Sequence, residues 1–401
     1  MSNEPSTSGV FARQPAPLQD REGRLDPFDW YQKMRDERPV SYDEERRAWD
    51  VFKYDAVRTV LSDYETFSSD TPPDDDSGAD DSSPLSASMI SVDPPEHERL
   101  RQFVDDRFQP DAIRDRRPYI ETVAESLLDD IEGETFDIVS AYSFPLPVIV
   151  IAELLDIPAE RRDEFKQWSD ALVAAPREQT EETLRKNEQH RTQSIAEMSS
   201  FFRNALTERR GSDRDDLVTL AANAEALSPT EQLGFCILLL IAGNITTTNL
   251  ITNAIWSFAE QDILHAVASG AVDRKQAIEE ALRFRSPVQA MSRVATEDTE
   301  IDGVEIAADE RVTAWIGSAN RDESVFDNPD EFLPERSPNR HIAFGTGVHY
   351  CLGAPLARLE AGVALSTLFD RYDTIELRDD QFQPVSSPIV YGLESLPLHV
   401  E

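Results

Sequence analysis

A mainly α-helical fold with a small segregated β region is what this chain of 401 residues predicts. Helical patterning dominates from Glu96 to about Arg285. One helix of about 30 residues carries strong start signals. Short β-branched segments with turn residues gather mostly after Ser286. Because no internal repeat is visible, we expect one domain over residues 25–401, preceded by a flexible tail at 1–24.

The N-terminal third starts with an amphipathic stretch, DPFDWYQKMRDERPV, and a short strand near Ala48–Phe52. Residues 68–87 are rich in Asp, Ser and Pro, which predicts a long loop that is either functional or mobile. The helical region that follows should break near its prolines and at one glycine. These positions are Pro110, Pro145, Pro158, Pro176 and Gly211.

The best-marked helix begins at Ser228, where Pro229 and Glu231 complete a capping box with proline at the first helical position. Apolar residues continue to about Phe258. A helix of this length spans about 45 Å and must cross the core. Its centre, residues 242–249, is a patch of small and polar residues in otherwise apolar surroundings.

After Ser286 the pattern changes to short strands, with Gly303 supplying a turn. A helix is expected from Leu352 to about Phe369. The last segment, SSPIVYGLESLPLHV, predicts a terminal hairpin.

The net charge of -38 is extreme, and only five of the 39 basic residues are lysines. Acidic surfaces poor in lysine suit concentrated salt, where the Debye length falls to about 3 Å. We therefore expect a halophilic, archaeal source, with solubility alone as the alternative reason for the charge. So acidic a surface argues against nucleic-acid binding.

The longest apolar run, Phe235 to Ala242, is far shorter than the roughly 20 residues of a spanning helix. The N-terminus is polar, with no apolar signal core. We therefore expect a cytoplasmic protein without a membrane span, and a monomer. Two cysteines, Cys236 and Cys351, exclude a disulfide framework and a four-cysteine metal site. Cys236 lies in an apolar run and is expected to be a buried hydrophobe.

The segment FGTGVHYCLGAPLAR, residues 344–358, carries the chemistry. Gly345 and Gly347 permit a tight turn and close backbone approach to a flat group. Cys351 stands just before a predicted helix, whose N-terminus favours a thiolate, and Gly353 removes bulk beside the sulfur. A lone cysteine in such a turn is more often inert than functional.

This segment resembles the haem-binding loop of the cytochrome P450 family, F-G-x-G-x-H-x-C-x-G. Every fixed position is filled, by Phe344, Gly345, Gly347, His349, Cys351 and Gly353. Agreement at so many positions is highly specific. The resemblance covers roughly residues 25–400 and implies the P450 fold, a haem b cofactor and Cys351 as the iron ligand.

Other segments match the family in the same order. Glu280 and Arg283 match its E-x-x-R pair, which joins a third residue, here Arg336, in a buried ion network. An ordinary surface pair three residues apart is the alternative. The resemblance also implies that the haem propionates are bound by four donors, which are His97, Arg101, Arg293 and His349.

On the distal side, the family pattern A-G-x-(acid)-T matches Ala242, Gly243 and Thr246, with Thr246 as the expected donor to oxygen. The acid position holds Ile245, which cannot relay a proton. Asn244 is a candidate for holding water, and is equally well explained as an ordinary polar residue of the helix. We expect proton relay through water and Thr246. Poor coupling with loss of peroxide, or direct use of peroxide, are the alternatives.

The resemblance implies a monooxygenase that inserts oxygen into a lipophilic molecule such as a terpenoid, fatty acid or steroid. Its electrons should come from a ferredoxin with its reductase, docking on a basic patch of Arg107, Arg340 and Arg358. Substrate is expected against residues 68–90, 172–176, 239–246, 288–291 and 389–391. A peroxygenase or dehydratase, a non-catalytic ligand-binding or sensor protein on the same fold, and a helical protein without haem remain the alternatives.

Overall fold

The computed structural model describes residues 14–70, 84–158, 161–173, 180–378 and 382–401. Its helices are η1 (Ala16–Leu18), α1 (Arg21–Leu25), α2 (Phe28–Glu37), α3 (Tyr54–Ser62), η2 (Pro84–Ala87), α4 (Glu96–Phe108), α5 (Pro110–Arg114), α6 (Arg117–Asp129), η3 (Val139–Ser143), α7 (Pro145–Leu154), α8 (Arg162–Val173), α9 (Glu181–Arg209), α10 (Leu217–Ala222), α11 (Pro229–Glu260), α12 (Leu264–Ala268), α13 (Arg274–Phe284), α14 (Ile316–Ala319), η5 (Gly347–His349) and α15 (Ala354–Arg371). Its strands are β1 (Val40–Asp43), β2 (Ala48–Val51), β3 (Phe67–Ser68), β4 (Thr135–Asp137), β5 (Met291–Ala295), β6 (Thr299–Ile301), β7 (Val304–Ile306), β8 (Arg311–Ala314), β9 (Ile375–Leu377), β10 (Gln383–Pro384), β11 (Leu393–Ser395) and β12 (Pro397–Val400). The expected fold class is confirmed.

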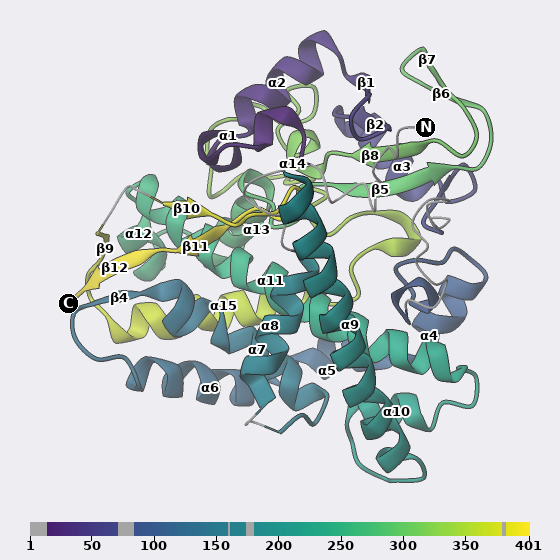
Figure 1. Ribbon diagram of the computed structural model, residues 1–401. Coiled ribbons are helices and arrows are strands. Elements are labelled where there is room, and N and C mark those ends of the chain that lie inside the picture. The colour runs from purple at the N-terminus through teal and green to yellow at the C-terminus, as the bar shows by residue number, and fades with distance from the viewer. Residues whose placement is uncertain (1–13, 71–83, 159–160, 174–179, 379–381) are drawn as a thin grey trace.

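The main sheet lies at one end of the molecule, beside the helical part (Figure 1). Its strand order is β1-β2-β8-β5-β3, and only the β2–β8 pair is parallel. Val51, Val312 and Ala314 on these strands are fully buried and pack against α3. Strand β5 carries Arg293, which lies opposite Val312 of β8 in this sheet.

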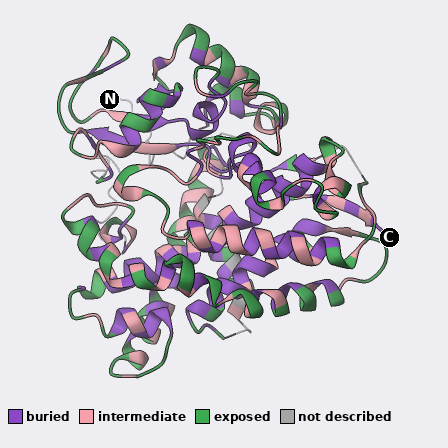
Figure 2. Ribbon diagram, turned by 180° about the vertical axis from the view of Figure 1, so that it is seen from behind, coloured by how far each residue is buried: buried purple, intermediate pink, exposed green. Residues whose placement is uncertain are grey.

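Helix α11 crosses the helical part and contacts α7, α9 and α15. The predicted capping box is present, since Ser228 and Glu231 bond each other's backbone N–H groups. Figure 2 shows buried residues along the inner helices and exposed residues along the outer ones. From the longest apolar run, the sequence predicts no helix long enough to span a membrane. By length and composition alone, however, α11 is long and apolar enough to do so. In the structure, 78% of its most apolar window is buried inside the protein. It is the core helix that the sequence predicts.

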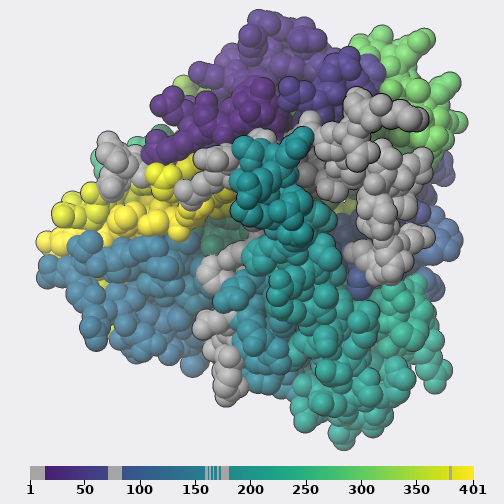
Figure 3. Space-filling view, viewed as in Figure 1, coloured from purple at the N-terminus to yellow at the C-terminus, as the bar shows by residue number. Residues whose placement is uncertain are grey.

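The expected tail at residues 1–24 is too long. Residues 1–13 lie outside the described part, but η1 and α1 are folded onto the C-terminal strands, as Figure 3 shows for this face. Leu18 is buried, and Arg21 Nε donates to the Phe382 carbonyl at 3.0 Å. Tyr391 Oη–H donates to the Leu25 carbonyl at 2.6 Å. Contacts made by residues distant in the sequence order this segment.

The predicted terminal hairpin is wrong. Strands β11 and β12 are separated by Leu396 alone, and they pair with different partners. Strand β11 pairs with β10, whereas β12 lies between β4 and β9. The chain passes from one small sheet into the other at Leu396, and this residue is fully buried.

The expected ion network is present and buried. Glu280 and Arg283 have fully buried side chains joined by a 2.7 Å ion pair, and Arg336 Nε lies 3.1 Å from Glu280. Arg283 also donates to the carbonyls of Asn320 and Pro329. The network therefore joins α13 to the irregular segment before the cysteine loop.

Candidate functional site

The loop that carries Cys351 turns where the sequence places its glycines. Gly345 and Gly347 have φ values of 72° and 69°, which only glycine adopts without strain. A Cβ on Gly347 would lie 2.8 Å from Ser62 Cα, so this position also needs glycine for space. The Cys351 N–H donates to the Phe344 carbonyl at 2.9 Å and holds the cysteine at the start of α15.

Cys351 opens into a cavity of about 280 Å³ between α11, β5, α15 and the cysteine loop. The walls are mostly apolar, with cationic and imidazole side chains at one side. They include Met89, Ile90, His97, Arg101, Ile151, Leu239, Ala242, Gly243, Thr246, Thr247, Leu250, Val288, Met291, Arg293, Phe344, Gly345, His349, Cys351, Gly353 and Leu356. Every residue that the sequence predicts to bind haem lies in this lining, and the cavity brings together segments from Leu61 to Ala357.

The four expected propionate donors lie side by side. The rings of His97 and His349 are 4.4 Å apart, and His349 Nε2 lies 2.9 Å from Ser69 Oγ. Arg101 Nη1 donates to the Tyr350 carbonyl at 2.7 Å, next to Cys351. Arg293 is buried on β5. The sequence grouped these donors by resemblance, and the structure places them around one cavity.

The charges of these four donors suit a ligand that carries carboxylates. Burial lowers the pKa of Arg293 to about 10, because the nearby Asp93 offsets only part of the cost of burying the guanidinium. His97 Nδ1 is buried and has no hydrogen-bond partner among the described residues. Carboxylates satisfy both kinds of donor. The donor set and the mostly apolar walls therefore fit haem b.

Burial raises the pKa of the Cys351 thiol, whereas the Gly353 N–H and the Arg101 and Arg358 charges act in the opposite direction. A coordinating metal removes the thiol proton outright, so this site is suited to a metal ligand rather than to a free nucleophile. A Cβ on Gly353 would lie 3.9 Å from the sulfur, in ordinary contact. Cys236 is fully buried in α11, as expected.

On α11, the described lining contains Ala242, Gly243 and Thr246 but neither Asn244 nor Ile245. Asn244 is 1% exposed, because the helical period turns position 244 away from the cavity side. Thr246 Oγ1 donates to the Ala242 carbonyl at 2.9 Å. The structure adds Thr247 to the lining, a residue that the sequence interpretation missed. Thr247 follows Gly243 by four residues, so helical periodicity places both on the same face of α11, and this spacing could have predicted its position.

The expected substrate-contacting regions are brought together only in part. Met89, Ile90, Leu239, Val288 and Met291 line the cavity. Residues 389–391 do not line the cavity. Val390 forms an isolated antiparallel β-bridge with Val288, and the Tyr391 hydroxyl donates to the Leu25 carbonyl. Leu172 is also absent from the lining, and the expected contacts at 71–83 and 174–176 lie outside the described residues.

Two arginines of the expected basic patch are paired with acids. Arg107 Nη1 lies 2.5 Å from Asp215, and Arg358 Nε lies 2.6 Å from Glu279. Arg340 is exposed and has no ion pair within the described ranges. Burial alone would raise the pKa of Glu279, but the hydrogen bonds and charges of Arg358 and His341 lower it to about 2. Neighbouring acids therefore neutralise most of this patch.

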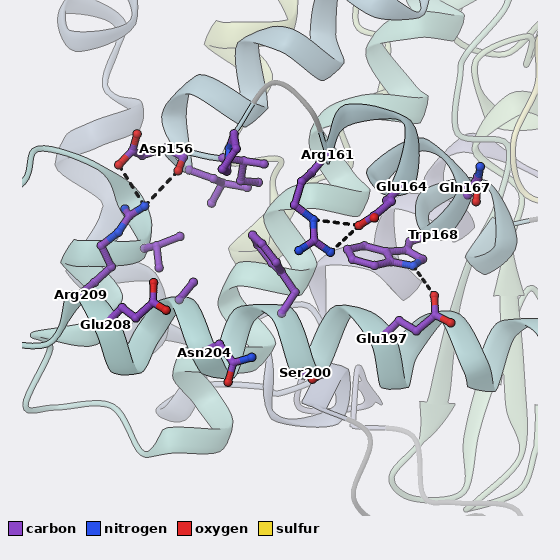
Figure 4. A pocket seen from close by; sticks show the side chains of 16 residues that line it. Asp156, Arg161, Glu164, Gln167, Trp168, Glu197, Ser200, Asn204, Glu208 and Arg209 are labelled. Carbon is purple, nitrogen blue, oxygen red and sulfur yellow. Dashed lines mark hydrogen bonds and ion pairs between the residues drawn. The ribbon is translucent and has the colours of Figure 1, made fainter.

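A second, larger hollow of about 750 Å³ lies on the surface between α8, α9 and the segment after α7 (Figure 4). Several of its charged groups have hydrogen-bond or ion-pair partners within the hollow. Arg161 Nε donates to Glu164 at 2.8 Å, Trp168 Nε1 donates to Glu197 at 2.8 Å, and Arg209 lies 3.0 Å from Asp156. Among the described residues, its lining holds neither cysteine nor histidine, so this part lacks the chemistry of the Cys351 cavity.

The fold and the Cys351 cavity define a haem-thiolate protein. The Cytochrome P450 family pattern matches residues 274–399. Cytochrome P450 109 of Bacillus spizizenii is 41% identical over 391 residues, covering 96% of this chain and 94% of that protein. Erythromycin C-12 hydroxylase of Saccharopolyspora erythraea is 39% identical over 384 residues, covering 92% and 94%. The crystal structure of a P450 from Bacillus megaterium with testosterone matches with a TM-score of 0.89 at 41% identity, covering 95% of this chain and 99% of that chain.

The chain belongs to the cytochrome P450 family. It is a haem-thiolate monooxygenase with haem b as its cofactor. With electrons from a redox partner it inserts one oxygen atom from dioxygen into a lipophilic small molecule.

Proposed function

We propose that Cys351 ligates the haem iron and that His97, Arg101, Arg293 and His349 bind the propionates. The observation that carries this assignment is one cavity with the cysteine sulfur, four propionate donors and apolar walls. When bound, the haem supplies oxygen activation, which a thiolate ligand favours. The cysteine replacement described in the Discussion tests the assignment.

The protein's own groups bind, orient and exclude water around the haem. Leu239, Val288 and Met291 present apolar surface to the substrate, which holds it without competing polar groups. The small residues Ala242 and Gly243 leave space in the cavity where α11 lines it. We assign Thr246 as a hydrogen-bond donor on this wall, and Asn244 as a residue that holds water behind it.

We propose a steroid-sized lipophile as the substrate. The cavity lining is mostly apolar around the expected substrate region. The similar Bacillus megaterium structure contains testosterone, and another relative is named for hydroxylating erythromycin. Both molecules are bulky and built on rings, unlike an extended fatty acid, and testosterone is the more apolar of the two.

Testosterone is expected to shift the ferric Soret band to shorter wavelength with a Kd on the order of 20 µM. This figure follows from about 0.3 kcal/mol for each of about 21 heavy atoms. A spectral titration measures it, with a long-chain fatty acid in parallel. Val288→Trp should weaken steroid binding about tenfold or more by filling the cavity. Binding of the fatty acid without binding of the steroid would contradict this substrate class.

We propose a ferredoxin as the electron donor, docking near the cysteine loop. Tyr350 beside Cys351 is one of the exposed large hydrophobic residues, and Arg340 nearby in sequence is exposed. Arg340→Glu should slow reduction by ferredoxin about tenfold at low salt, since steering depends on charge. Stopped-flow reduction measures the rate, with the exposed Arg38→Glu as the control. Equal rates in both variants and the wild type would remove the docking site from this surface.

We propose a cytoplasmic, monomeric protein adapted to concentrated salt. The net charge of -38 supports salt adaptation, because like charges destabilise the compact state unless ions screen them. The free energy of unfolding should rise by about 2 kcal/mol or more between about 0.1 M and 2 M KCl, as many repulsions of a few tenths of a kcal/mol weaken. Denaturant melts measure it. Sucrose, which favours burial without screening charge, is the control. Equal stability at both salt concentrations contradicts the adaptation.

A further inference from the structure

Helix η2 packs against the first turns of α11, and Gly234 lies at the point of contact. The glycine is buried, and a Cβ built on it would lie 2.2 Å from the Pro84 carbonyl oxygen of η2. The obstacle is backbone, which cannot rotate away as the end of a flexible side chain can. Gly234 is therefore a notch in α11 that lets η2 approach the helix more closely than any other residue would allow.

The chain that leaves η2 leads directly into the haem cavity. Met89 and Ile90 line that cavity. The Ser88 N–H donates to the Leu85 carbonyl at 3.0 Å, and the Ser91 N–H donates to the Ser88 carbonyl at 3.0 Å. Because these tight turns connect η2 to the two lining residues, a movement of η2 moves Met89 and Ile90 with it.

The same part of α11 also holds the chain beyond these two residues. The rings of Phe103 on α4 and Phe235 on α11 meet edge to face, with centroids 4.7 Å apart. Arg99 of α4 forms an ion pair with Glu231 of α11. The segment that carries the two lining residues is thus fixed to α11 on both sides, by the notch before it and by α4 after it.

The notch lies on the cavity side of α11. Leu238 and Ala242 follow Gly234 at steps of four residues, and both line the cavity. Side chains at this spacing lie on one face of a helix. The depth at which η2 lies on this face therefore sets the distance between Met89 or Ile90 and the wall that α11 contributes.

We propose that Gly234 is a positioning residue that determines selectivity, because it seats η2 so deeply that Met89 and Ile90 contact a bulky substrate. This inference deepens the proposed binding of a steroid-sized lipophile and rests on it. An alanine methyl needs about 1 Å more room, since ordinary contacts start at 3.4 Å and the notch leaves 2.2 Å. A gap of about 1 Å forfeits a quarter to a half of the dispersion attraction between facing atoms.

The test uses the haem-loaded full-length enzyme with Gly234→Ala. Gly362→Ala is the matched control, because Gly362 lies within α15 and a Cβ there meets nothing within 4 Å. The Kd for testosterone, from spectral titration, should rise about fivefold in Gly234→Ala and stay within about twofold in Gly362→Ala. Imidazole, a small ligand of the ferric iron, should bind both variants like the wild type, which shows an intact haem site.

A double-mutant cycle tests whether Gly234 acts through the two lining residues. In a background with Met89→Ala and Ile90→Ala, the further change Gly234→Ala should alter the testosterone Kd by less than about twofold. An undiminished fivefold effect in this background overturns the proposed route. Leu85→Ala loosens η2 from its own side without changing α11, and should raise the Kd about twofold. This variant tests the same seat if Gly234→Ala fails to take up haem, and an unchanged Kd in it overturns the proposal.

Hydrogen exchange provides a readout without any ligand. The amides of Ser88 and Ser91 should exchange about tenfold faster in Gly234→Ala than in the wild type or Gly362→Ala, because η2 no longer lies firmly on α11. Unchanged exchange overturns the seat, and faster exchange with unchanged testosterone affinity overturns the role in selectivity. A wild type that binds imidazole but not testosterone refutes the steroid substrate instead. The exchange comparison then still decides whether Gly234 seats η2, and 4-phenylimidazole replaces testosterone as the bulky probe.

Discussion

Replacing Cys351 by serine is expected to abolish the strongly red-shifted Soret band of the reduced, CO-bound protein and nearly all monooxygenase activity. The band reports a thiolate ligand, and a serine hydroxyl at this position supplies none. The Cys351 N–H bond to Phe344 and the glycine turns do not depend on the sulfur, so the loop should keep its shape. Difference spectra of the reduced protein measure the effect, and haem content per chain is measured alongside.

Cys236→Ala is the control for this replacement. It removes the other thiol, which is buried in α11 where burial raises its pKa, and it lies outside the cavity lining. Its CO spectrum should match the wild type, at a small cost in stability. Cys351→Ser that keeps the wild-type band would require a different iron ligand, and the assigned site would be wrong.

Glu280→Gln is expected to lower the free energy of unfolding by about 3–5 kcal/mol, a large part of a typical domain's stability. The Glu280 carboxylate accepts from Arg283 at 2.7 and 2.8 Å, Arg336 at 3.1 Å, the Leu333 N–H at 2.9 Å and Asn339 at 3.0 Å. Glutamine keeps the shape but leaves two guanidinium groups without their counter-charge. Chemical denaturation followed by circular dichroism measures the loss.

An exposed pair provides the comparison. Arg117 and Glu121 form a 3.2 Å ion pair on α6 with side chains that are 47% and 45% exposed. Glu121→Gln should change stability by no more than about 0.5 kcal/mol. If Glu280→Gln proves equally mild, the buried network contributes little to folding. Haem content of the soluble fraction then shows whether it acts on the cysteine loop instead.

The local elements were well predicted because their signals are local. The capping box at Ser228, the turn at Gly303 and the strand near Ala48–Phe52 depend on neighbouring residues, and all are present. The terminal hairpin failed because β11 and β12 are decided by distant strands. The tail at 1–24 was overestimated for a related reason, since C-terminal residues hold Arg21 and Leu25.

The site was predicted unevenly for similar reasons. The cysteine loop is one continuous motif, so the sequence identified it without knowledge of the fold. Thr247 was missed because the family pattern stops at Thr246, whereas the helical period decides which side chains face the cavity. Asn244 carried the polar signal but lies on the buried side of α11.

By itself, the sequence determined the fold class, the cysteine that serves as the proposed iron ligand, and the kind of group it would hold. These conclusions rest on a contiguous motif and on short-range patterns. Only the tertiary structure decided that His97, Arg293 and His349 meet at one cavity, that Asp215 and Glu279 neutralise two of the patch arginines, and which hydroxyls of α11 reach the haem side. Burial, pairing and helix orientation depend on partners far away in the chain, and only folding specifies those partners.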